Sequence, residues 1–211
     1  MARTPCCIFI LFCAAWCMAL NMQKYYWESE KIRIRAIEEA DIQRFVDRRN
    51  KIDSEGQWLE DSLEFPLSEE GTRKELIDYI EQLSKDDKKF FIIETLAGGY
   101  VGSVDVWFTR TRIGIFRYGI RLEPEHRRKG YGKEALIIIL DYYFNELGYQ
   151  KCGPMVYEFN TASQAFHENF GFVREGALRN EIYSRGRYHS MIYYGMLKDE
   201  FNQLYRHWHW R

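Results

Sequence analysis

Cysteine and net charge are both scarce through most of this 211-residue chain. Four of the five cysteines lie within the first 17 residues, and Cys152 alone follows them. This distribution excludes a disulfide framework for the main part of the chain and is typical of a reduced, cytoplasmic protein. Lys and Arg number 30 against 31 Asp and Glu, which gives a formal net charge of −1. We therefore expect no nucleic-acid partner and no membrane partner for the domain, and any anion site must be local.

A run of apolar residues long enough to span a membrane is also missing. The nearest approach is the hydrophobic, Cys-rich stretch at residues 1–21. Its apolar part is roughly 15 residues long, short of the ~20 that a spanning helix needs. It resembles the core of a signal peptide or a short anchor. We favour the interpretation that it is an added segment, or that translation starts later, at Met18 or Met22.

The remaining length predicts one domain over residues 22–200. A chain that is 46% hydrophobic and 17% aromatic can bury a full core. Residues 201–211 form an aromatic, His-containing tail. Its two histidines at alternate positions, 207 and 209, are too few to hold a metal, so we predict no metal site.

From residue 32 onward the apolar pattern switches between the strand period and the helix period. Strands are expected at 32–37, 89–96, 100–110, 113–124, 149–160, 172–179 and 181–197, and helices at 38–50, 68–87, 133–147 and 160–171. The order is therefore β-α-α-β-β-β-α-β-α-β-β. About seven strands and about four helices, with no internal repeat, predict an α+β fold.

A glycine-containing basic loop joins the fourth strand to the longest helix. Gly130 and Gly132 allow a tight turn and a close approach to the backbone, and free N–H groups at the following helix start attract an anion. Arg127, Arg128, Lys129 and Lys133 add positive charge. A hydrogen bond to a charged group is worth roughly 1.5 to 3 kcal/mol, so several such bonds hold a pyrophosphate without a globally basic protein.

Two common phosphate loops do not fit this segment. The Mg²⁺-nucleotide loop needs Ser or Thr directly after Gly-Lys, where this chain has Glu134. The dinucleotide loop needs a third glycine and a parallel first strand, and this loop follows antiparallel strands.

A third pattern, [QR]-x-x-G-x-[GA], matches residues 127–132. Downstream, Asn160, Ser163, His167, Gly171 and Phe172 have the spacing N-x-x-S-x-x-x-H-x-x-x-G-F. The chain thus resembles the GNAT acetyltransferase superfamily over residues 32 to about 197. Its opening and closing strands resemble the branch that contains ribosomal-protein and polyamine acetyltransferases.

The resemblance implies a mostly antiparallel, twisted sheet that is splayed between its fourth and fifth strands, with acetyl-CoA as co-substrate in the opening. It also implies which residues bind that molecule. Backbone amides of Ile120, Arg121 and Leu122 would meet the pantetheine arm. The pyrophosphate would lie on Arg127, Arg128, Lys129, Gly130, Tyr131, Gly132 and Lys133. Asn160, with Ser163 beside it, would bind the pantetheine amides, although Asn160 is equally a helix cap.

The catalytic residues are less clearly marked. The family's usual Tyr acid is replaced by His167, which is a candidate acid or an exposed helix residue without a catalytic role. Glu158 shares a strand face with Asn160 and is the first candidate base, and Asp105 is the second. Each of these carboxylates is also explained as a solvated strand residue, and a water chain is an alternative base.

The acceptor is expected to be a primary amine of a small cationic molecule or a peptide N-terminus. Polyamine enzymes of this branch carry Glu-Phe-Gln on the fourth strand, where this chain has Arg117-Tyr118-Gly119. This difference argues against a polyamine as the acceptor. The resemblance does not exclude a polyamine, because the acidic segment 55–70 lies where this fold usually builds its acceptor site, although the segment is also explained as a solvated loop. A degenerate domain that binds acyl-CoA as a sensor, or a partner-binding module, is the alternative function. The family also makes a homodimer a candidate assembly.

Overall fold

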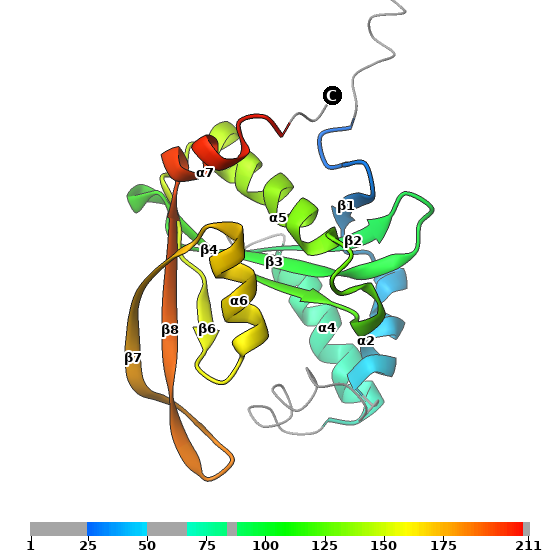
Figure 1. Cartoon of the computed structure of the whole chain (residues 1–211). Helices are drawn as coiled ribbons and strands as arrows, with labels where there is room; N and C mark the ends of the chain where they lie inside the picture. The colour runs from blue at the N-terminus through cyan, green and yellow to red at the C-terminus, as the bar shows by residue number, and fades with distance from the viewer. Residues whose placement is uncertain (1–24, 50–66, 84–87, 209–211) are drawn as a thin grey trace, which may run out of the picture.

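A computed structural model describes residues 25–49, 67–83 and 88–208 (Figure 1). The predicted extension 1–21 and most of the acidic segment 55–70 lie outside the described residues. Within them, no helix is both long and apolar enough to cross a membrane.

The elements follow the expected order and add a helix at the end. They are β1 (Ile32–Ala36), η1 (Glu39–Asp41), α2 (Ile42–Arg49), α4 (Glu69–Leu83), β2 (Lys89–Thr95), β3 (Tyr100–Arg110), η2 (Thr111–Ile113), β4 (Ile115–Leu122), η3 (Pro124–His126), α5 (Tyr131–Asp141), η4 (Tyr142–Glu146), β5 (Lys151–Cys152), β6 (Met155–Tyr157), α6 (Thr161–Phe170), β7 (Val173–Ser184), β8 (Arg187–Leu197) and α7 (Lys198–Tyr205).

The sheet divides beyond the first residues of β4. Strand order is β1-β2-β3-β4-β5-β8-β6, with β7 on β8. Every pairing is antiparallel except that of β4 with β5, which covers only Ile115 with Lys151 and Phe116 with Cys152. β6 then pairs with β8 and leaves β4 without a neighbour on that edge. The predicted mostly antiparallel sheet, splayed after its fourth strand, is confirmed.

Helices cover both faces of the β1–β4 part of the sheet, with α5 on one face and α2 and α4 together on the other (Figure 1). Residues 135–140 of α5 are all buried. The outer side of this helix is covered by the segment before β1, where the Tyr26 hydroxyl donates to Asp141 at 2.6 Å and Trp27 packs on Tyr142. Because residues 135–140 are buried on all sides, this part of the helix has no polar face, which explains its apolar sequence.

Four expectations about the elements need correction. The single strand at 149–160 is two short strands, because the chain between β5 and β6 contains Pro154, which has no N–H to donate. β7 continues to Ser184, so the hairpin turn lies at Arg185 and Gly186, both with positive φ. The long helix starts at Tyr131 and ends in a π-helical turn, η4.

The fourth correction concerns the C-terminal tail, which begins with a helix. In α7, Phe201 is buried against Phe144 of η4, and the Glu200 carboxylate accepts from the Leu197 amide at 2.8 Å. No helix was predicted there, because the apolar face of α7 is only two turns long, too short for periodicity to reveal.

Candidate functional site

The basic loop between β4 and α5 has the backbone of an anion site. Arg128 and Gly130 both have positive φ, 59° and 87°. The Arg127 amide closes a turn on Pro124, and the Glu134 amide bonds to the Gly130 carbonyl. Between them, within the described structure, the amides of residues 128–133 make no turn or cap hydrogen bond. Alternating left-handed residues with free N–H groups at a helix start form a concave site for phosphate oxygens.

Gly132 brings this helix start against its neighbours. A Cβ atom at Gly132 would lie 3.1 Å from Leu122 Cδ1 and 3.6 Å from Phe166 Cε2. Leu122 ends β4 and Phe166 belongs to α6, so the loop, the strand end and α6 meet at this residue. A larger residue would push the loop away from the strand that is expected to bind the pantetheine arm.

The four cations of the loop are not equivalent. Arg127, Arg128 and Lys129 are exposed, and Arg127 Nε donates to the Leu122 carbonyl at 3.2 Å. Lys133 Nζ lies 5.4 Å from the centre of the Tyr205 ring in α7, in a cation–π contact. Arg127 is thus held across the end of β4, whereas Lys133 is drawn toward α7.

Lys31 is a fifth cation at this loop and was not expected from the sequence. Its Nζ lies 3.3 Å from the position that a Cβ of Gly130 would take, and 3.1 Å from Glu134 Oε1. The other carboxylate oxygen of buried Glu134 accepts from the Ser29 hydroxyl at 2.6 Å. Roughly 100 residues separate the two segments in sequence, so no local pattern indicates this contact.

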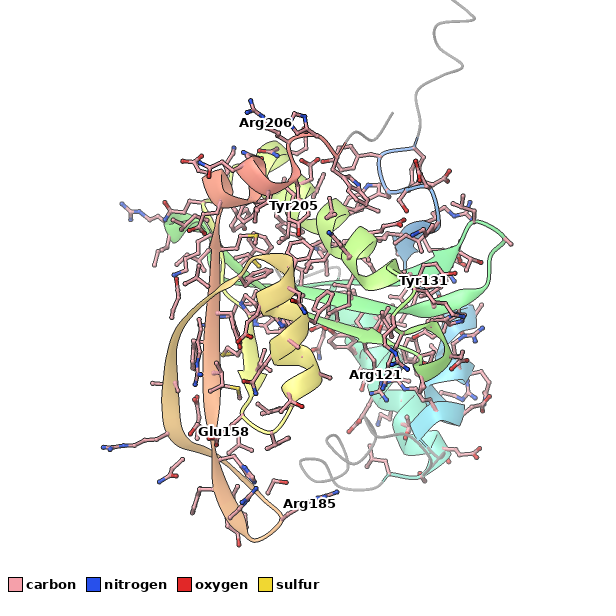
Figure 2. The ribbon with its side chains drawn as sticks, viewed as in Figure 1. Arg121, Tyr131, Glu158, Arg185, Tyr205 and Arg206 are labelled. Carbon is pink, nitrogen blue, oxygen red and sulfur yellow. The ribbon has the colours of Figure 1, made fainter. Side chains whose placement is uncertain are left out.

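The free edge of β4 lies beside the loop. Ile120, Arg121 and Leu122 pair with β3 on one side and, among the described residues, with no strand on the other. Burial, reinforced by the charge of nearby Arg48, lowers the pKa of Arg121 to about 10. Figure 2 shows Arg121 on the same side of the molecule as Tyr131, the first residue of α5.

Asn160 caps α6 and retains its amide group for a ligand. Its Oδ1 accepts from the Ser163 amide at 3.0 Å. The cap uses the oxygen alone, so both roles considered for Asn160 are compatible. Ser163 serves as the cap partner, and its carbonyl accepts from His167.

His167 is buried, contrary to the view that it is an exposed helix residue. Its Nδ1 lies 2.7 Å from the Ser163 carbonyl oxygen, so Nδ1 carries a proton. Nε2 is buried without a hydrogen-bond partner in the described structure. The ring stacks on Tyr118 and Tyr194. Burial lowers the pKa of His167 although the Ser163 carbonyl opposes the shift, so the neutral form is favoured at neutral pH.

Glu158 lies apart from the other candidates. It is exposed beyond the end of β6, and its carboxylate accepts from the Ser190 amide at 2.9 Å. That hydrogen bond is the main cause of a lowered pKa for Glu158. Figure 2 shows Glu158 well away from Arg121 and Tyr131. A carboxylate with a lowered pKa is a weak base.

Asp105 has the opposite properties. On β3 it faces Gly119 of β4, where its Oδ1 lies 2.6 Å from the position of an added Cβ. A side chain at position 119 would therefore displace this carboxylate from its present position. Burial raises the pKa of Asp105 to about 6, with a smaller opposing effect of Lys88. A carboxylate whose pKa is raised by burial at the edge of a pocket is a candidate general base.

An open pocket of about 230 Å³ surrounds Asp105. Its walls are Tyr79 of α4, Lys88 before β2, and Val106 and Trp107 of β3. A carboxylate between aromatic rings is a common environment for an ammonium group. No group of three or more His, Cys, Asp or Glu within the described ranges is arranged to hold a metal ion.

Comparison with known proteins agrees with this architecture. The family model described as "Acetyltransferase (GNAT) domain" matches residues 31–173. The chain is 36% identical over 176 residues to an SPbeta prophage-derived uncharacterized N-acetyltransferase, YokL, of Bacillus subtilis, covering 83% of this chain and 95% of that protein. It is 27% identical to the spermidine N(1)-acetyltransferase of Vibrio cholerae, covering 76% and 89% of the two chains.

Solved structures share the fold. The crystal structure of spermidine N-acetyltransferase from Vibrio cholerae in complex with CoA and spermine superimposes with a TM-score of 0.70 at 23% identity, covering 82% of this chain and 99% of that one. A crystal structure of a probable acetyltransferase gives a TM-score of 0.69 at 26% identity, with coverage of 82% and 96%. The chain belongs to the GNAT acetyltransferase family and is an acetyl-CoA-dependent N-acetyltransferase.

Proposed function

We propose that this enzyme transfers the acetyl group of acetyl-CoA directly to a primary amine that is bound in the Asp105 pocket. The acceptor is a small cationic molecule or a peptide N-terminus. The observation that carries the proposal is the position of Asp105, a partly buried carboxylate with a raised pKa that lies over Gly119, in the part of β4 that has no second neighbouring strand among the described residues.

The residues fit acetyl-CoA in three places. Amides 128–133 and the basic side chains around them would hold the pyrophosphate, the edge of β4 at 120–122 would bind the pantetheine arm, and the Asn160 amide group would donate to it. When bound, acetyl-CoA supplies an activated thioester carbonyl. The edge amides of β4 would polarise that carbonyl.

Removal of a proton from the acceptor is the larger energetic demand. A lysine-like ammonium with a pKa near 10.4 is neutral about once in a few thousand molecules at pH 7, a handicap of roughly 4 to 5 kcal/mol. Asp105, with a pKa of about 6, is mostly ionised at pH 7 and is a stronger base than an ordinary carboxylate. In the proposed reaction the amine nitrogen forms the new bond to the acetyl carbon, and its proton passes to Asp105 directly or through water.

Protonation of the leaving thiolate requires less catalytic assistance than deprotonation of the acceptor amine. A thiol with a pKa near 8.5 costs only about 2 kcal/mol to release near neutrality. His167 was a candidate acid, but its Nδ1 proton is directed at the Ser163 carbonyl and its pKa is lowered. We propose that His167 packs α6 against Tyr118 and Tyr194, and that water protonates the thiolate.

The test is release of CoA thiol from acetyl-CoA with a panel of amines, followed by mass spectrometry of the acceptor. The proposal requires an acetylated amine and its loss in Asp105→Asn with CoA binding retained. Tight CoA binding without turnover for any amine would instead favour the sensor alternative, which the replacement of the usual Tyr by His167 suggests. Because acetyl-CoA is a cytosolic metabolite, we also propose that the enzyme works in the cytoplasm.

A further inference from the structure

Arg117 extends from the same face of the sheet as the proposed base. It stands two residues before Gly119 on β4, so both residues face the same side. Its partner across the strand pair is Trp107, which lines the Asp105 pocket. An acceptor whose amine lies at Asp105 therefore has Arg117 as a neighbour along the strand.

The guanidinium of Arg117 has only weak partners. Its Nη1 donates to the Met155 Sδ atom at 3.2 Å, and its Cζ lies 5.8 Å from the centre of the Tyr193 ring. Its Nε is buried and makes no hydrogen bond in the described part of the chain. No carboxylate of the described residues lies within ion-pair distance of it.

This arrangement of Arg117 costs free energy unless an anion binds to it. A buried N–H group without an acceptor costs free energy, and a thioether sulfur is a weak substitute for a carboxylate. A guanidinium offers parallel N–H donors that match the two oxygens of a carboxylate or phosphate. The missing partner of Arg117 is therefore an oxyanion.

The charges of the pocket also favour an acceptor with an anionic group. Among the described residues its lining has one carboxylate, Asp105, and one ammonium, Lys88, and Arg117 pairs across the strands with the lining residue Trp107. One carboxylate suits one ammonium group. A polyamine would place its further ammonium groups next to Arg117, at an unfavourable like-charge contact.

We infer that Arg117 is a specificity-determining residue that binds an oxyanion of the acceptor, a carboxylate or a phosphate, while Asp105 receives its amine. The inference rests on the proposed function and narrows the class of acceptor. The enzyme acetylates amines that carry an anionic group and discriminates against polyamines.

Matched acceptors provide the test. We would measure kcat/KM for ω-amino acids with three to five carbons, for α,ω-diamines of the same lengths, and for aminoalkyl phosphates. The diamines differ from the amino acids only in the sign of the distal charge, and the phosphates distinguish the two oxyanions. Wild-type enzyme should prefer at least one oxyanion series over the diamines by tenfold or more.

Substitution identifies the residue responsible. Arg117→Met, which packs beside Met155 and Tyr193, should lower kcat/KM for the preferred anionic acceptor by roughly tenfold to a hundredfold, and should raise kcat/KM for the diamines or leave it unchanged, because the like-charge contact is removed. Arg117→Gln should show the same pattern and guards against a packing fault in the first variant. Arg112→Gln, which removes a cation from the exposed turn between β3 and β4, is the control and should leave the preference intact.

The outcomes distinguish failure of the Arg117 inference from failure of the proposed function. Acetylation of diamines at rates equal to or above those of the anionic acceptors overturns the inference but not the proposed function. An equal loss for both series in both Arg117 variants also overturns it. Absence of turnover with every amine overturns the proposed function, and the inference with it.

Discussion

Lys31 and Glu134 form an ion pair of 3.1 Å that joins the segment before β1 to the first turn of α5, directly behind the phosphate loop. Glu134 is buried, and its negative charge repels a phosphate bound at the same helix start. Lys31 compensates for this charge and places its own Nζ against Gly130.

Lys31→Met is therefore expected to weaken CoA binding by severalfold, because Glu134 is left uncompensated near the pyrophosphate. The free energy of unfolding should fall by about 1 to 2 kcal/mol, a modest value because Lys31 is half exposed and Ser29 still donates to Glu134. Calorimetric titration and urea unfolding measure the two effects. Pantetheine, which has no phosphate, is the matched ligand, and an equal loss for CoA and pantetheine would contradict the prediction.

Asp105 should control the acidic limb of the pH–rate profile. Since the base must be ionised, kcat/KM should fall as pH is lowered through about 6. Asp105→Asn should lower kcat by 10²- to 10⁴-fold and abolish that limb. A limb that persists unchanged in Asp105→Asn would assign the base to another group.

The same carboxylate should reduce stability at neutral pH. Its pKa rises from an ordinary value near 3.8 in the unfolded chain to about 6 when folded, so the folded state holds the proton more tightly. The contribution of Asp105 to stability is thus lost as pH rises from about 4 to 6. Asp105→Asn should raise the free energy of unfolding at pH 7 by up to roughly 3 kcal/mol and have little effect at pH 4. Urea unfolding at both pH values tests the sign.

His167 should prove replaceable by an aromatic ring. His167→Phe keeps the stack on Tyr118 and Tyr194 and removes the unpaired buried Nε2, so kcat should stay within about twofold of wild type. His167→Ala should cost about 3 kcal/mol of unfolding free energy through the cavity it leaves. A tenfold loss of kcat in a stable His167→Phe variant would restore the acid role expected from the sequence.

Asn160 allows its two roles to be separated. Asn160→Ser keeps an oxygen for the Ser163 amide but loses the amide donors, so we expect stability near wild type and weaker CoA binding. Asn160→Ala should lose both the cap, about 1 kcal/mol, and the binding. Thermal unfolding and CoA titration of the pair measure these effects. Equal CoA affinity in wild type and Asn160→Ser would leave Asn160 as a cap alone.

The sequence by itself determined the elements and the donor site. The apolar periodicity predicts most strands and helices, because alternation and helical spacing are local properties. The loop at 127–132, with Asn160 downstream, indicates acetyl-CoA, because free amides at a helix start are properties of a short segment. The breaks at Pro154 and at Arg185–Gly186 were missed, since pairing partners determine where a long apolar run divides.

Only the tertiary structure decided which side chains act together. Glu158 and Asp105 were both expected on strands, yet Glu158 lies beyond the end of β6, accepts from the Ser190 amide and has a lowered pKa, while Asp105 is partly buried over Gly119 and has a raised pKa. The contact of Lys31 with the loop brings together segments that are distant in sequence. The surroundings of Arg117, whose Nε is buried without a hydrogen bond among the described residues, also come from distant segments. Desolvation and ion pairing depend on neighbours in space, and these neighbours exist only once the sheet has formed.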